Sequence, residues 1–312
     1  MQHPALTDTV LMIRPAHFGF NPQTAADNKY QQPDPRAAET IAELARAEFD
    51  AFVQQLEAVG VQVVQVADTP SPVKTDAVFP NNWFSTHTDG RVILYPMLAP
   101  TRRLERRLDC IESLIQAGFR VEEVIDLSFF EESGQFLEGT GSIVMDRAAH
   151  RIYACRSERT HEVPLRYLSE LLGAPYTLFQ AEQELEGQRY PIYHTNVMMH
   201  IGKNLAVVAL DTLPSKAEQH LLLQQLQEAG KAILPIKPKQ VQAFAGNMLE
   251  LASRSGDTYT VLSRTAYESL KPSQVRQLEK QSGLLIPEIP TIERLGGGSV
   301  RCMLAEIFLP RV

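Results

Sequence analysis

The stretch AETIAELARAEFDAFVQQLEAVGVQVVQVA, Ala38 to Ala67, contains the unit that decides the fold. Its first part has apolar residues at helical spacing, Gly60 then interrupts this pattern, and the run VQVVQVA that follows is rich in β-branched residues. A glycine just past a helix accepts the left-handed backbone conformation at no steric cost. The stretch therefore predicts a helix, a glycine that ends it, and a strand.

The same order of helix, glycine and strand recurs four more times. The later helical segments are TRRLERRLDCIESLIQA, VPLRYLSELL, SKAEQHLLLQQLQEA and PSQVRQLEKQS. Successive glycines stand 53 to 58 residues apart, at Gly60, Gly118, Gly173, Gly230 and Gly283. A regular period of this length indicates a repeat architecture. Because one unit cannot bury both of its faces alone, we expect five units around a shared axis, with strands inside and helices outside.

This repeat predicts an α/β fold in which residues 1–312 form a single domain, a fivefold pseudo-symmetric α/β propeller. A length of 312 residues would also allow two domains. The regular period and the absence of a linker rich in Pro, Gly or Ser favour one domain instead.

The composition restricts the class of protein. With 44% hydrophobic and 21% charged residues, the chain should form a packed globule. Its net charge is -7, and its one basic patch, TRRLERR, is not interleaved with aromatic residues, so we expect no nucleic-acid partner. No signal peptide opens the chain and no apolar run reaches the roughly 18 residues of a membrane span, which predicts a cytoplasmic protein. Three cysteines without metal-type spacing support neither a disulfide framework nor a zinc site.

One polar residue stands at a corresponding place in each unit, in the loop that leads into a second strand. The loop sequences are DAVFPNNWFST, FLEGTGSIVMD, YHTNVMMHIG, FAGNMLELAS and LGGGSVRCMLAEI. The polar residues follow the glycines by 17 to 22 positions and are Asn82, Glu138, His194, Asn247 and Cys302. We expect these side chains to converge near the axis. A thiol, a base that takes its proton and groups that hold a substrate are what a nucleophilic site needs.

Each candidate also has a structural alternative. Cys302 could be a small buried hydrophobe, as many free cysteines are, but its alignment with His194 and Glu138 and the three glycines before it favour a nucleophile. An imidazole at this position can take a thiol proton and return it to a leaving amine. For Cys110, on the apolar face of a helix, and Cys155, at the end of RIYACRS, packing is the expected role.

The remaining alternatives are a core position for His194, a solvated loop position for Glu138, and a turn beside a core aromatic for the segment FPNNWF, which contains Asn81 and Asn82.

The motifs together resemble a known group of enzymes. A fivefold pseudo-repeat with LEGTGS, a central histidine strand and a C-terminal GGGSVRCMLAEIF resembles the pentein fold of arginine deiminases, dimethylarginine dimethylaminohydrolases and amidinotransferases. With FGFNPQTAADNKYQ and FPNNWFSTH added, the chain is most similar to the amidinotransferase-like branch that includes citrulline utilisation hydrolases. The motifs span Phe18 to Cys302.

This resemblance implies a role for each residue that matches. Cys302 is implied as the nucleophile, His194 as the general acid and base, and Glu138 as the carboxylate that binds the substrate head group and orients the histidine. The family reaction starts with attack of a thiolate on the central carbon of a guanidine or urea, and it uses no cofactor and no metal. LAPTRRLE is similar to the stretch that places an arginine on the substrate carboxylate, so Arg102 or Arg103 is a candidate for that contact, with a solvated helix start as the alternative.

The substrate is expected to be a small amino acid with an uncharged head group. Asn82 and Asn196 stand where arginine-directed relatives carry aspartates. An amide both donates and accepts, so it can bind the NH₂ and C=O of a ureido group, whereas a buried guanidinium would need carboxylates. We therefore expect citrulline, hydrolysed to ornithine, ammonia and carbon dioxide. Asn81 and Asn247 are further candidates for binding the substrate.

Other functions are compatible with the same motifs. The resemblance also covers amidinotransferases and hydrolases of the arginine or dimethylarginine deiminase type. Ribosome anti-association factors of the same fold have no catalysis, but they lack the cysteine, histidine and glutamate found here. A homo-oligomer is compatible with the sequence.

The long loop AHFGFNPQTAADNKYQQPDPR, Ala16 to Arg36, is expected to be functional. We expect it to fold over the site as a lid, with Phe18 or Asn28 reaching the substrate.

Overall fold

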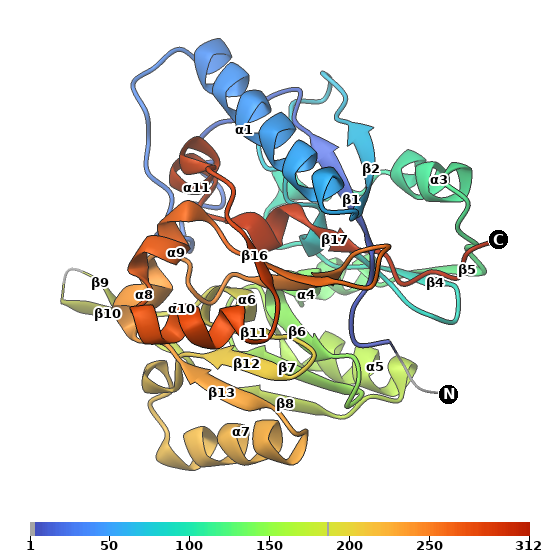
Figure 1. Ribbon diagram of the computed structural model, residues 1–312. Helices are drawn as coiled ribbons and strands as arrows, with labels where there is room; N and C mark the ends of the chain where they lie inside the picture. The colour runs from blue at the N-terminus through green and yellow to red at the C-terminus, as the bar shows by residue number, and fades with distance from the viewer. Residues whose placement is uncertain (1–3, 186) are drawn as a thin grey trace.

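The computed structural model describes residues 4–185 and 187–312, which form five three-stranded sheets and one separate hairpin (Figure 1). In each sheet the middle strand pairs antiparallel with one neighbour and parallel with the other. In order across each sheet, the strands are β17 (Ala305–Glu306), β1 (Thr9–Arg14) and β2 (Gln62–Ala67); β3 (Phe84–Thr86), β4 (Arg91–Leu94) and β5 (Glu123–Asp126); β6 (Ile143–Asp146), β7 (Arg151–Cys155) and β8 (Tyr176–Phe179); β11 (Met199–Ile201), β12 (Leu205–Val208) and β13 (Ala232–Pro235); and β14 (Leu249–Ala252), β15 (Thr258–Val261) and β16 (Gly283–Leu285).

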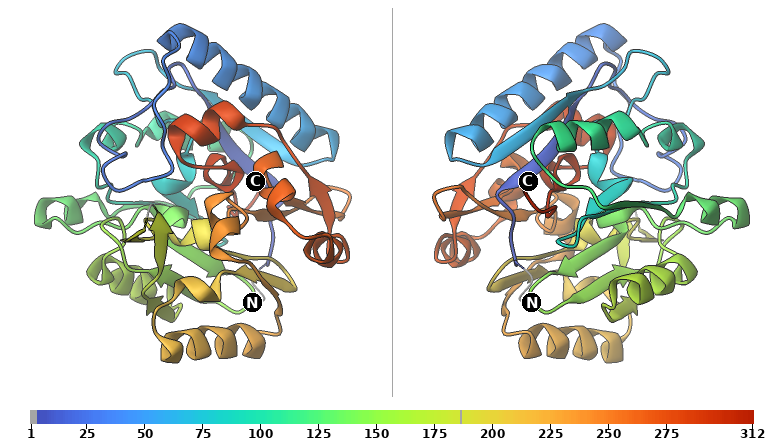
Figure 2. Two further views of the ribbon diagram at one scale, coloured as in Figure 1. Left: turned by 90° about the vertical axis from the view of Figure 1, so that its left-hand side faces the viewer. Right: turned by 90° about the vertical axis from the view of Figure 1, so that its right-hand side faces the viewer.

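A helical connection joins the two parallel strands of every sheet, because parallel neighbours need a crossover. The crossover helices are α1 (Ala38–Ala58), α3 (Leu108–Gln116), α5 (Glu162–Leu172), α7 (Lys216–Glu228) and α10 (Pro272–Glu279). Figures 1 and 2 show these helices at the periphery of the molecule and the sheets inside. The shorter helices are α2 (Pro100–Arg103), α4 (Gly139–Ser142), α6 (Thr195–Met198), α8 (Pro238–Gln242), α9 (Arg264–Ser269), α11 (Pro290–Gly296), η1 (Pro80–Asn82), η2 (Ser128–Ser133), η3 (Leu210–Thr212) and η4 (Val300–Met303).

Helix α1 shows why the apolar spacing produces this arrangement. Its residues Phe49, Phe52 and Leu56 lie on one face, are fully buried, and belong to one core cluster with Val10 and Met12 of β1. Burial of each such side chain contributes about 1.5–3 kcal/mol. The opposite face of α1 is polar, so the helix covers the sheet and faces solvent on its other side.

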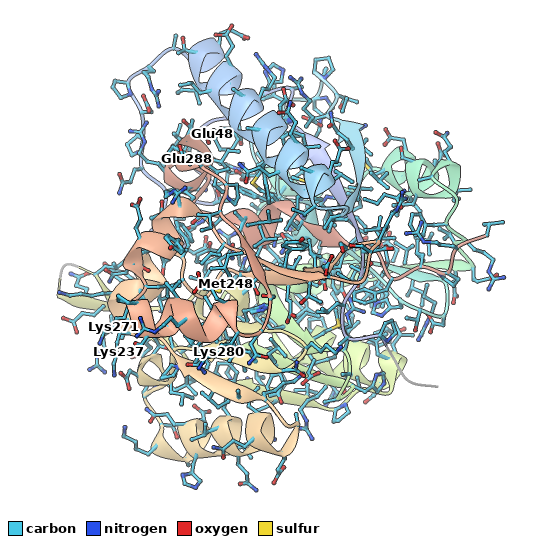
Figure 3. All side chains as sticks on the ribbon, viewed as in Figure 1. Glu48, Lys237, Met248, Lys271, Lys280 and Glu288 are labelled. Carbon is cyan, nitrogen blue, oxygen red and sulfur yellow. The ribbon has the colours of Figure 1, made fainter. Side chains whose placement is uncertain are left out.

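Another contact of α1 fixes the position of helix α11. The carboxylate of Glu48 accepts hydrogen bonds from the backbone N–H groups of Thr291 (2.8 Å) and Ile292 (3.0 Å) in the first turn of α11. Figure 3 labels Glu48 on α1 beside that helix. Since α11 runs directly into the triple glycine, this contact helps to fix the segment that precedes Cys302.

The first and last segments of the chain share one sheet. Strand β1 pairs with β17, with Val10 opposite Glu306 and Leu11 opposite Ala305. The hairpin of β9 (Glu182–Leu185) and β10 (Gln188–Pro191) is an addition that the repeat does not predict. None of the helices in the described part of the chain combines the length and the apolar character of a membrane span.

Four of the five predicted glycine stops have the expected backbone. Gly60, Gly118, Gly173 and Gly230 have φ between 64° and 88°. Gly283 differs, because it opens strand β16 without a positive φ, and the turn after α10 is closed by Gln281 and Ser282, whose N–H groups bond Leu278. A Cβ at position 283 would lie 2.7 Å from the ring of Tyr259, so glycine serves close packing there.

Candidate active site

The five polar residues aligned from the repeat all lie within five residues of the start of the strand that pairs antiparallel with the middle strand of a sheet. Asn82 ends η1 before β3, Glu138 and His194 precede α4 and α6, Asn247 lies just before β14, and Cys302 is in η4 before β17. Each is at most 3% exposed. The structure therefore places the five in equivalent positions, each at the entry to a sheet.

Asn82, His194 and Cys302 line one small cavity. The other residues around it are Thr24, Asn28, Gln31, Asp76, Phe79, Arg102, Arg159, Tyr193, Gly296, Gly297 and Gly298. Within the cavity, the volume that the centre of a water molecule can reach is about 10 Å³. This leaves room for roughly one water. The site is closed in this conformation, so an amino acid could enter only after a wall moves.

Glu138 lies behind His194 and forms the centre of a charged network. Its Oε2 is 2.9 Å from His194 Nε2 and 3.4 Å from Arg159 Nη1, while Oε1 accepts from the Leu98 N–H at 3.0 Å. Burial disfavours the charged form, but Arg159, the bond with His194, and Arg102 at 4.0 Å outweigh it and hold the pKa of Glu138 well below its usual range. Glu138 is therefore ionised at neutral pH.

His194 is held neutral beside this carboxylate. Burial lowers its pKa and the charges of Arg159 and Arg102 lower it further, although Glu138 opposes both effects. A neutral imidazole oriented by a carboxylate can accept a proton. Gly141 of LEGTGS explains the close packing here, because a Cβ at that position would lie 2.7 Å from His194 Nδ1 and 2.4 Å from Asn82 Nδ2.

Cys302 lies close to the triple glycine, Gly296 to Gly298. A Cβ on Gly298 would stand 3.4 Å from the Cys302 Cβ, and a Cβ on Gly297, whose φ is +60°, would meet Asn28 at 2.6 Å. The sulfur itself is contacted by the side-chain Nδ2 atoms of Asn247 (3.4 Å) and Asn196 (3.6 Å). The glycines thus let the loop of residues 16–36 and Cys302 approach this segment closely, because no side chain stands between them.

Asn196 and Asn247, both expected to bind the substrate, are not among the residues that line the cavity. Both contact the sulfur from the protein interior. Asn81 is also fully buried away from the cavity, where its backbone carbonyl accepts from Thr140 Oγ1 at 3.2 Å. Of the five asparagines that the sequence analysis connects with the substrate, Asn82 and Asn28 reach the cavity wall.

The loop of residues 16–36 covers the cavity and contributes to its wall. Asn28 Nδ2 donates to the Gly297 carbonyl (3.0 Å), Gln31 Nε2 donates to the Gly296 carbonyl (2.9 Å), and Asp27 pairs with Arg159 (2.6 Å). Phe18 does not line the cavity. It packs in the core with Phe79 under Gly296, because an apolar ring gains more from that contact than from a polar cavity.

Arg102 and Arg103 point in different directions, since successive residues of a helix are rotated by about 100°. Arg102 is buried, bonds Glu105 through Nε (3.0 Å) and Nη2 (2.8 Å), and donates from Nη1 to Asn82 Oδ1 (2.7 Å). Arg103 lies outside the cavity, with its side chain 32% exposed and paired with Glu131 (3.2 Å). Arg102 alone of the two is available to the site.

Three ionisable residues of the wall, Asp76, Arg159 and Tyr193, were not predicted from the sequence. Asp76 is buried, accepts from Asn21 Nδ2 (2.7 Å), and has no hydrogen-bond partner for Oδ1 among the described residues. Burial raises the pKa of Asp76, with Arg102 opposing. Arg159 joins Glu138 to Asp27, and the Tyr193 hydroxyl donates to the Gly297 carbonyl (2.5 Å). No repeat position marks these residues, although Tyr193 directly precedes His194.

A metal site is not evident in the described part of the chain. Across residues 4–185 and 187–312, no group of three or more His, Cys, Asp and Glu side chains could hold a metal ion. The chemistry that the cavity can support uses a thiol, a neutral imidazole and an ionised carboxylate.

Comparison with known proteins gives a family and a fold. The family model described as N,N dimethylarginine dimethylhydrolase, eukaryotic, matches residues 14–309. No curated protein matches the chain. Apo ArgZ, an arginine dihydrolase from the ornithine–ammonia cycle in cyanobacteria, is similar with a TM-score of 0.73 at 13% identity, covering 97% of this chain and 41% of that chain. The chain thus spans about two fifths of the length of ArgZ.

Two further structures cover nearly the whole of both chains. The N-terminal domain of ArgZ, covalently bound to a reaction intermediate, has a TM-score of 0.71 at 13% identity, with 97% of this chain and 99% of that chain covered. A dimethylarginine dimethylaminohydrolase, as an adduct with 4-chloro-2-hydroxymethylpyridine, has a TM-score of 0.64 at 16% identity, with 96% and 99% covered. At these identities the likeness shows a shared mixed α/β fold.

Proposed function

The chain belongs to the N,N dimethylarginine dimethylhydrolase family, whose members are pentein-fold hydrolases of carbon–nitrogen bonds, and we propose that it hydrolyses the ureido group of citrulline through a covalent thiol intermediate. The observation that carries this proposal is the orientation of Asn82. We further propose that the five sheets form one closed fivefold propeller domain, which the pairing of β1 with β17 supports.

The proposed reaction uses Cys302, His194 and Glu138. His194 takes the proton of the Cys302 thiol, and the resulting thiolate attacks the ureido carbon. A carbon–nitrogen bond of the ureido group then breaks as the imidazolium gives this proton to the leaving nitrogen, which departs as ammonia or as the amine. His194 then takes a proton from water, whose oxygen attacks the carbon and breaks the carbon–sulfur bond. The carbamate released decomposes to carbon dioxide and the second nitrogen product. Ionised Glu138 orients the imidazole and stabilises it while it carries the proton.

Asn82 selects the head group by presenting a donor. Arginine can only donate, so the bond from Arg102 Nη1 identifies the Asn82 atom that it contacts as the amide oxygen. The Asn82 Nδ2 therefore remains toward His194 and has no hydrogen-bond partner among the described residues. A ureido oxygen would accept from this N–H, whereas a guanidinium carries donors alone and would leave it unpaired.

The rest of the cavity fits an α-amino acid. Asp76 Oδ1 and Gln31 Oε1 are acceptors without a partner in the described residues, and Asp76 suits an α-ammonium group. Arg102 and Arg159 are the cations available to a substrate carboxylate. Because the closed cavity has room for about one water, we propose that the loop of residues 16–36 opens to admit the substrate.

The test compares kcat/KM for citrulline, arginine, agmatine and dimethylarginine. We expect citrulline to be preferred over arginine by about 10²-fold or more, because a mismatched head group leaves polar groups of the site unpaired. Asn82→Asp should shift this ratio toward arginine, since it replaces the free donor by an acceptor. Asn81→Asp is the matched control, because that neighbour lies outside the cavity. Preference of the unmodified enzyme for arginine would overturn the proposal.

A second candidate, hydrolysis of arginine, is favoured by the charge of the site. The carboxylates Asp27, Asp76, Glu105 and Glu138 outnumber the guanidiniums Arg102 and Arg159, and a cationic substrate would offset this excess. Burial raises the pKa of Glu105 to about 7, which reduces the excess without removing it. Product stoichiometry separates the two, because arginine gives two ammonia molecules per ornithine and citrulline gives one. Added amine separates hydrolysis from amidino transfer.

A further inference from the structure

The sulfur of Cys302 is contacted by two side-chain amides. Asn247 Nδ2 lies 3.4 Å from Sγ and Asn196 Nδ2 lies 3.6 Å from it, both within the range of an N–H···S hydrogen bond. Cys302 is 3% exposed, so solvent can stabilise a thiolate there only weakly. Among the described residues, no cationic side chain forms a hydrogen bond with the sulfur. The two amides are therefore the local donors for a negative charge on Sγ.

The orientation of Asn247 is fixed by its other bonds. Its Oδ1 accepts from the Arg301 backbone N–H at 3.0 Å, and a backbone N–H can only donate. The Nδ2 must then face the other way, toward Sγ and toward the Asn196 carbonyl, to which it donates at 3.1 Å. Asn247 is fully buried. Rotation of the amide would break two bonds, so its NH₂ is held against the sulfur.

Asn196 has no such constraint. Its Oδ1 has no hydrogen-bond partner among the described residues. Its contact with the sulfur is also the longer of the two. We therefore propose that Asn247 is a positioning residue for the reaction: it fixes η4 through Arg301 and stabilises the Cys302 thiolate through its N–H. This inference rests on the proposed function in one respect, the role of Cys302 as nucleophile.

Other charged or titratable groups surround the sulfur and must be held constant in a test. Arg102, Arg159, His194, Asp76 and Tyr193 line the same cavity, with Glu138 behind His194 and Glu105 behind Arg102. The Arg301 guanidinium turns away and bonds Glu306 (2.7 Å) and the Leu304 carbonyl (2.7 Å). A substitution at position 247 leaves all of these side chains in place. Asn247→Leu removes the amide without adding a charge, whereas Asn247→Asp also places a carboxylate beside the sulfur.

The experiment measures alkylation of Cys302 by iodoacetamide across pH, without substrate. Asn247→Asp keeps an acceptor for Arg301 but replaces the N–H at the sulfur by an oxygen, and Asn247→Leu removes both groups at similar size. We expect Asn247→Asp to slow alkylation at neutral pH by about tenfold or more and to move the pH midpoint of the rate upward, with Asn247→Leu showing a smaller change in the same direction. Asn196→Leu should shift the midpoint least. Cys110 and Cys155, both fully buried, serve as internal controls by peptide mass.

The outcomes separate this inference from the proposed function. An unchanged pH midpoint in folded Asn247 variants, with alkylation of Cys302 still abolishing turnover, would overturn the inference alone. Turnover that survives full alkylation of Cys302 would overturn the proposed function. If Asn247→Asp does not fold, Asn247→Ala removes the N–H without supplying another donor, and an unchanged midpoint in that variant also contradicts the inference.

Discussion

The two sides of the proposed active-site cavity are built from different chemistry. Behind His194 lie charged groups, with Glu138 contacting His194 and Arg159 at 2.9 and 3.4 Å. Beside the sulfur of Cys302 lie neutral amides, and Asn247 Nδ2 contacts the sulfur at 3.4 Å. Fixed charges suit a site where a proton must be held at a known atom, because they set which form of the imidazole is stable. Neutral donors suit the atom on which a charge appears and disappears during turnover.

This comparison predicts that substitution of Cys302, on the sulfur side of the cavity, causes the largest single fall in kcat. Cys302→Ser should lower kcat by at least about 10⁴-fold, because a serine hydroxyl has no thiolate-like form near neutral pH and the amides cannot supply one. Steady-state ammonia release measures the effect. Cys155→Ser is the control, since Cys155 is equally buried and contacts the Ile192 carbonyl and Thr195 away from the cavity. Similar losses in both variants would place the nucleophile elsewhere.

Substitution of Glu138, on the charged side of the cavity, should cause the next largest fall in kcat. Glu138→Gln keeps the shape of the side chain but removes the charge that orients His194 and stabilises its protonated form. We expect kcat to fall by about 10²- to 10⁴-fold. Glu131→Gln is the matched control, because Glu131 pairs with Arg103 and Arg106 outside the cavity. Equal effects of the two substitutions would contradict a special role for Glu138.

The pH profile sharpens the same prediction. In the unmodified enzyme the pKa of His194 lies below its usual 6.5, so kcat/KM should hold at pH 6.5 and fall as the pH drops further and the imidazole is protonated. Glu138 raises this pKa, so Glu138→Gln should move the acid limb to still lower pH. Because the folded pKa is depressed, the stability that His194 contributes is present above pH 6.5 and is lost as the pH falls. An acid limb that stays in place would show that another group titrates.

The difference between the two sides also explains what the sequence could predict. The repeat identified Asn82, Glu138, His194, Asn247 and Cys302 because each stands at the same structural position, shortly before the strand that pairs antiparallel with the middle strand of a sheet. The period of the sequence repeat predicts where the backbone of each residue lies in the fold. It does not carry the direction in which a side chain points, so it grouped Asn247 with the substrate ligands although its amide faces the sulfur from the interior.

The charged network was less predictable because its members lie outside the repeat position. Arg159 is in SERTHE, which reads as an exposed polar turn, yet it is 2% exposed and pairs with Glu138 and Asp27. Its partners are 21 and 132 residues away, so no local pattern marks them. Arg102 and Arg103 were equivalent in the sequence, and helical rotation at α2 separated them.

The smallest expected effect tests whether the loop of residues 16–36 belongs to the charged side as a moving part. Asp27 joins the loop to Arg159 at 2.6 Å, while Asn28 and Gln31 hold it through the Gly297 and Gly296 carbonyls. Asp27→Asn removes one of these contacts and leaves Glu138 paired with Arg159, so the chemical step should be nearly intact.

We expect Asp27→Asn to lower kcat/KM by about 3- to 10-fold, mainly through KM, because a half-closed loop holds the substrate less well. The loss stays modest because buried Arg159 keeps its pair with Glu138. Protease protection of the loop on adding citrulline should weaken in parallel. Asp34→Asn is the control, since Asp34 pairs with Arg36 and Arg294 outside the cavity. If both variants change KM equally, general loosening of the loop explains the effect. If only Asp27→Asn changes it, the charged side of the cavity extends into the loop and links closure of the site to the carboxylate that orients His194.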